Sequence, residues 1–159
     1  MQFEYGLSGK WLELLKQIAP SVARAAVLRD PAIVAGIGQF AIIQSVAPSV
    51  GVEVSPINAR DATELEGAVT GFANSSNGGL IVTASVPAVV HRDLTIVLVA
   101  RHKLPAVYYR RYFVASGGLV SCGPDIPDHF RRAAAYVDRI LKGEKPATFR
   151  RRRRPSTNW

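Results

Sequence analysis

Short apolar runs alternate with segments of helical periodicity along almost the whole chain, and this alternation is the strongest constraint on its fold. The apolar runs have the length of strands that are buried on both faces of a sheet. Each is followed by a segment whose apolar residues recur at the spacing of one helix face. Strands joined through helices in this way form a parallel sheet covered by helices on both sides.

We therefore expect an α/β fold: a three-layer αβα sandwich around a doubly wound, mainly parallel five-stranded sheet, as in a flavodoxin-like or Rossmann-like single lobe. The predicted strands are residues 24–28, 52–57, 80–84, 106–109 and 118–122. The predicted helices are residues 9–19, 35–49, 62–74, 86–101 and 125–141, the first capped by Ser8 and the third by a capping box of Asp61 and Glu64.

The length of 159 residues fits one domain with one core. We predict a single α/β lobe over residues 1–147 and a disordered, arginine-rich tail over residues 148–159. The net charge of +8 includes five consecutive arginines, Arg150 to Arg154, so the body is only mildly basic. A protein that binds nucleic acid through its basic tail is therefore only the third hypothesis, after the two that are given below. Nucleic acid is not an expected partner.

Little in the sequence indicates catalysis or a cofactor. Cys122 is the only cysteine, which excludes an intrachain disulfide. The three histidines, His91, His102 and His129, do not have the spacing of metal ligands, and no nucleophile motif is present. We expect no metal, no cofactor and no enzyme activity.

One motif supports a different function. Residues 36–41 match the dinucleotide-binding pattern G-x-G-x-x-A, with Gly36 and Gly38 as its glycines. The motif should follow directly after a strand, but seven residues separate it from Leu28. A small nucleotide-dependent α/β enzyme that uses this region is therefore the alternative hypothesis.

Ligand sites of doubly wound sheets lie at the carboxyl ends of the strands. At these ends, Asp30 is either a ligand for an amine or a helix cap, and the turn at residues 116–118 either accommodates an anion or is a flexible connection. Residues 108–113 mix tyrosines, a phenylalanine and arginines, which either contact a small ligand or complete the core and its solvated surface. The other candidate positions at strand ends are Arg29, Asn58, Arg60, Ser85, Arg110 and Arg111.

Several segments in order resemble a known family. The chain is similar to the second lobe of ABC-transporter substrate-binding proteins with a type I periplasmic-binding fold at residues 9–16, 18–20, 26–31, 117–121, 123–125, 132–134 and 138–146. The resemblance covers residues 3 to about 147. It implies a module that binds a small organic solute, such as an amino acid or related carboxylate, with ligand contacts at Asp30, Ser85, Arg111, Ser116 and Gly117.

The resemblance also implies partners. In such proteins a second lobe closes over the solute, and a membrane permease receives it. This chain lacks the first lobe and a signal peptide, so we expect a truncated copy that is cytoplasmic as written, whereas family members are periplasmic. The surface of this lobe that faces the hinge in the family would then be exposed, which would favour homo-oligomers.

The tail departs from the family pattern. After residue 147 the family typically continues with a segment that returns to the hinge. A coding stretch for that segment, read one base out of register, yields nearly all of residues 148–159. We therefore hypothesise that the tail is a frameshift product, which sequencing of the DNA would test.

Overall fold

All five predicted strands form, and they pair into one parallel sheet. The structure, a computed structural model, describes residues 3–124 and 126–145. The strand order is β2-β1-β3-β4-β5, with every neighbouring pair parallel. The strands are β1 (Arg24–Leu28), β2 (Glu53–Ile57), β3 (Gly78–Val82), β4 (Ala106–Tyr108) and β5 (Val120–Ser121).

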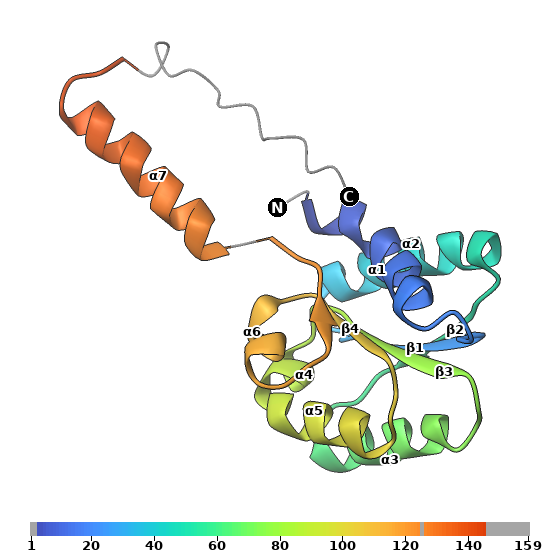
Figure 1. Cartoon of the computed structure of the whole chain (residues 1–159). Helices are drawn as coiled ribbons and strands as arrows, with labels where there is room; N and C mark the ends of the chain where they lie inside the picture. Colours follow the sequence, from blue (N-terminus) through green and yellow to red (C-terminus); the bar gives the residue numbers. More distant parts are fainter. Residues whose placement is uncertain (1–2, 125, 146–159) are drawn as a thin grey trace. The chain divides into compact units, whose positions relative to one another are not determined.

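Helices cover both faces of this sheet, as Figure 1 shows. Helices α1 (Phe3–Ile18) and α2 (Val34–Val50) pack together on one face. Helices α3 (Ala62–Ala73), α4 (Val86–Val90) and α5 (Arg92–Arg101) lie on the other, and a short helix α6 (Arg111–Ala115) follows β4. The predicted three-layer αβα sandwich with a doubly wound sheet is therefore confirmed.

The core lies on the two faces of the central strands. Strands β1 and β3 are almost completely buried, as their continuous apolar sequences predicted. Helix α1 contributes Trp11, Leu12 and Leu15 to this core. Strand β3 begins at Gly78 and not at Leu80, since Gly78 and Gly79 pair with Arg24 and Ala25 of β1. Helix α1 crosses it so closely that a Cβ atom on Gly79 would meet Leu15 Cδ2 at 2.9 Å.

The observed helix boundaries differ more from the predicted ones where no side-chain cap is formed. Ser8 does not cap α1, since the helix already begins at Phe3 and Ser8 is buried inside it. The capping box of α3 is confirmed, because Asp61 Oδ1 accepts a hydrogen bond from the Glu64 backbone N–H at 2.8 Å. Gly51 ends α2 in the left-handed conformation with φ 65°, as its sequence position indicated.

The single helix predicted for residues 86–101 is wrong, since the segment forms α4 and α5 with a break at His91. The Thr95 hydroxyl donates to the His91 carbonyl oxygen at 3.0 Å. A side chain that bonds the carbonyl four residues earlier bends a helix, and this accounts for the position of the break. Helix α6 was not predicted either.

The chain divides into two units, Met1–Pro124 and Asp125–Trp159. The second unit contains helix α7 (Ile126–Leu141), which agrees with the predicted helix. Apolar and charged positions lie on different sides of this helix, and Phe130, Val137 and Leu141 are exposed. The predicted domain boundary at residue 147 and the predicted disorder of residues 148–159 lie outside the described residues.

Candidate functional site

The strand ends meet at one edge of the sheet, and a pocket lies there. Leu28 of β1 is level with Ile57 of β2 and Val82 of β3, and Val82 is level with Tyr108 of β4. The loops that follow β1, β3 and β4 therefore converge at the carboxyl edge. They line an open pocket of about 220 Å³. Its lining residues are Ile33, Ala84, Ser85, Val86, Val89, Val90 and Tyr109.

Asp30 connects two of these loops. Its side chain is only 8% exposed. Oδ1 accepts a hydrogen bond from the Ala32 backbone N–H at 2.9 Å, and Oδ2 accepts one from the Val86 N–H at 3.3 Å. The carboxylate therefore fixes the start of α4 beside the loop that follows β1.

Ser85 lies next to this contact and lines the pocket. It is 2% exposed and forms the N-cap of α4, since its hydroxyl oxygen accepts a hydrogen bond from the Ala88 N–H at 3.3 Å. The structure thus brings two of the predicted site residues together. Both hold backbone N–H groups in place. Ser85 does so as the N-cap of α4, whereas Asp30 does so as a loop residue, since the N-cap of α2 is Ile33.

The other three predicted site residues, like Asp30, are not among the residues that line the pocket. Arg111 begins helix α6, and its side chain is exposed. Ser116 and Gly117 form the turn that ends α6, where Gly117 has φ 106°. The N–H groups of Ser116 and Gly117 donate to carbonyl oxygens of α6, so this turn is a helix C-cap.

The aromatic segment after β4 divides between core and pocket. Tyr108 and Phe113 are fully buried and stack with ring centroids 5.0 Å apart. Tyr109 lines the pocket, and its hydroxyl oxygen lies 3.0 Å from that of Tyr112. The core interpretation thus holds for Tyr108 and Phe113, whereas Tyr109 belongs to the site.

Most of the pocket wall was missed by the sequence analysis. Val86, Val89 and Val90 line it and are 56%, 43% and 68% exposed. In the sequence analysis they were placed in the predicted helix over residues 86–101 and were given no role in a site. The available signal was their position directly after a strand end, where apolar residues that are not needed for the core can contact a ligand.

The glycine motif behind the nucleotide hypothesis has a packing role. Gly36 lies in the first turn of α2, and a Cβ atom there would meet the Asp30 carbonyl oxygen at 2.8 Å and the Ala84 carbonyl oxygen at 3.1 Å. Both are backbone atoms of the chain itself. The close approach of these carbonyl oxygens is therefore what requires a glycine at this position.

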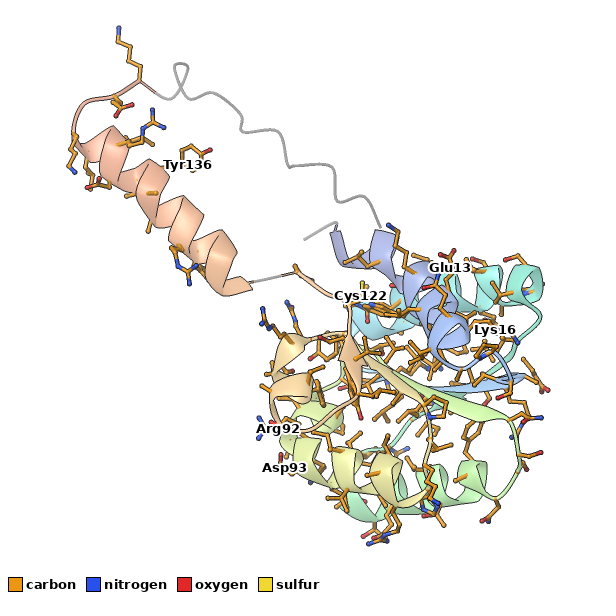
Figure 2. The ribbon with its side chains drawn as sticks, viewed as in Figure 1. Glu13, Lys16, Arg92, Asp93, Cys122 and Tyr136 are labelled. Carbon is orange, nitrogen blue, oxygen red and sulfur yellow. The ribbon has the colours of Figure 1, made fainter. Side chains whose placement is uncertain are left out.

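Other chemistry-bearing residues serve the packing of the lobe. Cys122 lies against α1, where Trp11 Nε1 donates to the Cys122 carbonyl oxygen at 2.6 Å (Figure 2). Burial raises the pKa of the Cys122 thiol, and Lys10 partly offsets this effect.

Among the described residues, no group of three or more His, Cys, Asp or Glu side chains could hold a metal ion. No helix in the described part of the chain has the length and apolar character to span a membrane.

Solved structures with the same fold are substrate-binding proteins and related chains. A conserved domain protein from Vibrio cholerae O1 biovar El Tor aligns with a TM-score of 0.71 at 20% identity, over 89% of this chain and 48% of its own. An ABC domain in complex with L-Trp from Streptococcus pneumoniae gives 0.71 at 21% identity, over 88% of this chain and 48% of its own. The ligand-free, open substrate-binding protein with adhesive properties from Clostridium difficile gives 0.68 at 19% identity, over 88% and 47%.

The fold and the position of the pocket thus define a single α/β lobe of the kind found in substrate-binding proteins, and the chain spans about half the length of these neighbours. The family model described as "ABC transporter substrate binding protein" matches residues 7–156. The chain therefore belongs to the ABC transporter substrate-binding protein family. A search of curated proteins found no match.

Proposed function

We propose that this chain is a solute-binding lobe of an ABC-type uptake system, and that it binds a small organic solute without chemical transformation. The observation that carries the proposal is the family match, which covers the chain from residue 7 to residue 156. The pocket at the carboxyl edge of the sheet supports it, since this edge is the usual ligand position in open α/β sheets.

The solute is an amino acid or a related carboxylate. One neighbour of the same fold, from Streptococcus pneumoniae, is described in complex with L-Trp. Arg111, which is exposed at the start of α6, supplies a guanidinium group of the kind that pairs with carboxylates. Ser116 and Gly117 are proposed as contacts beside it, and Asp30 and Ser85 as contacts at the pocket.

Closure against a second lobe would raise the affinity of this lobe for the solute. The pocket of about 220 Å³ is smaller than the range of about 300–1,000 Å³ that is typical of ligand pockets. A second lobe would supply the remaining walls, and a membrane permease would receive the solute. The neighbours, of which this chain spans about half, have the length for such a second lobe. We also propose that the chain acts outside the cytoplasm, as is typical of the family.

A thermal-shift screen of the full chain tests the proposed function. The ligands are the twenty amino acids, small carboxylates, and NAD and ATP as tests of the nucleotide hypothesis. A solute at 100 times its Kd stabilises the folded state by about 2.7 kcal/mol, which raises the unfolding temperature by several degrees. We expect a shift with amino acids or carboxylates. A shift with NAD or ATP alone would contradict the proposal and favour an enzyme.

A further inference from the structure

The carboxyl edge of the sheet offers a solute little that could hold a positive charge. The loops that follow β1, β3 and β4 contain one acidic residue, Asp30. Asp30 is buried, and its two carboxylate oxygens already accept hydrogen bonds from the backbone N–H groups of Ala32 and Val86. An ammonium group would therefore have to displace one of these bonds or enter a buried position beside them.

Backbone carbonyl oxygens at this edge are also bonded. Leu28, Val82 and Tyr108 are the last residues of three strands, and each of their carbonyl oxygens accepts an N–H bond at 3.0 or 3.1 Å. The Thr83 hydroxyl adds a second bond to the Leu28 oxygen at 2.9 Å, and the Ser85 hydroxyl oxygen caps α4. A charged group that loses its bonds to water and finds no new acceptor binds weakly, so this edge disfavours an ammonium group.

The charges on the β4 side of the pocket are positive. Tyr109 lines the pocket, and the guanidinium carbon of Arg110 lies 5.4 Å from the centre of its ring. Arg111 follows with an exposed side chain. Residues 94–124 contain no Asp or Glu, so no carboxylate of this stretch offsets the two positive charges. A carboxylate group at this wall is therefore attracted, whereas an ammonium group is repelled.

The rest of the pocket wall is mainly apolar. Val86, Val89 and Val90 line it beside Ile33 and Ala84, and the three valines are partly exposed. Hydrocarbon that covers these side chains leaves water together with them, which favours binding. The pocket thus suits a solute that has a hydrocarbon part and a carboxylate, whereas the acceptors that an ammonium group needs are already bonded.

We propose that this lobe selects aliphatic carboxylates that carry no ammonium group and discriminates against the corresponding amino acids. The carboxylate lies on the Arg110 side of the pocket, and the hydrocarbon part lies against the valines of α4. The ammonium group is rejected because Asp30, the one acid of these loops, is committed to backbone bonds. This inference rests on the proposed function and selects one of its two classes of solute.

Calorimetric titrations of the full chain with 4-methylpentanoate and with leucine test the proposal, since the two solutes differ only in the α-ammonium group. We expect 4-methylpentanoate to bind at least about tenfold more tightly, because leucine must desolvate its ammonium group without a new acceptor. The same preference should appear for 3-phenylpropanoate over phenylalanine, a second pair that differs only in this group.

An introduced carboxylate tests the cause of the preference. Val90→Asp places an acid on the pocket wall at a position that is 68% exposed, where a charged side chain is compatible with folding. It should reduce the preference for 4-methylpentanoate over leucine roughly fivefold, because the new charge attracts the ammonium group and repels the carboxylate. The control is Val97→Asp on α5, which is 51% exposed and does not line the pocket. It should leave the preference unchanged.

The outcomes separate this inference from the proposed function. Leucine that binds as tightly as 4-methylpentanoate, or more tightly, would overturn the inference and leave the proposed function in place. A preference that Val90→Asp leaves unchanged would show that the missing acceptor is not its cause, and this result would overturn the inference as well. If no amino acid or carboxylate binds, the proposed function fails and this inference fails with it.

Discussion

Tyr108 places a phenol hydroxyl in the core of the lobe. The residue is fully buried, its ring stacks on Phe113, and its hydroxyl group has no hydrogen-bond partner among the described residues. Burial raises the pKa of Tyr108 to about 12, since the charged phenolate is poorly solvated there. The hydroxyl therefore contributes little to stability at neutral pH.

We predict that Tyr108→Phe has the same free energy of unfolding in urea as the wild type at pH 7, or one that is higher by up to about 1 kcal/mol. Because the folded pKa lies above the unfolded value, the wild type loses stability as the pH rises from about 10 to 12, by about 2–3 kcal/mol. The variant should lack this loss. A control, Tyr136→Phe in α7, should show the wild-type pH dependence, and equal curves for all three proteins would contradict the prediction.

At the scale of elements, the start of α2 depends on Gly36. A Cβ atom there would meet the Asp30 carbonyl oxygen at 2.8 Å, and backbone atoms cannot move away cheaply. We predict that Gly36→Ala destabilises the lobe by about 1–3 kcal/mol, although alanine has the better helix propensity. Urea unfolding measures the change.

Gly71→Ala in α3 is the matched control for this substitution. No atom lies within 4 Å of the Cβ position of Gly71 except in its own helix and chain neighbours. The propensity gain alone then applies, and we expect a stabilisation of about 0.5–1 kcal/mol. A stabilisation of similar size at Gly36 would show that the close packing of the α2 start is not as described.

The elements of the lobe were largely predictable from sequence, and the errors have local causes. Strand β1 and the caps at Asp61 and Gly51 follow from apolar runs and short-range side-chain chemistry. The break at His91 depends on the bond from the Thr95 hydroxyl, and periodicity does not register such a bond. The pocket wall was missed for a related reason: α4 exposes Val86 and Val90, and only the tertiary packing decides which face of a short helix is buried.

The predicted site residues show the same limit. The position of the site at the strand ends follows from the α/β topology and is read from sequence order. Hydrogen bonds within the lobe decide which polar groups are available to a ligand. Asp30 and Ser85 use their oxygens to hold backbone N–H groups. One of these bonds joins residues 56 positions apart, Asp30 and Val86, and a linear pattern does not reveal such a bond.

At the scale of the whole molecule, helix α7 carries an exposed apolar side. Phe130, Val137 and Leu141 are exposed on it. We predict concentration-dependent self-association of the chain, which light scattering after gel filtration would measure, because such surfaces associate in water. The double variant Val137→Asp and Leu141→Asp should weaken association at least about tenfold. Val97→Asp on α5 is the control, and an equal effect of the control would show that α7 is not the surface involved.

The most direct test of the central claim is a calorimetric titration of the full chain with leucine at several temperatures. A solute-binding lobe with an apolar pocket predicts saturable binding at one site and a negative heat-capacity change, because apolar surface is removed from water. Absence of a saturable signal with leucine, together with saturable binding of NAD or ATP, would contradict the assignment of the chain as a solute-binding lobe.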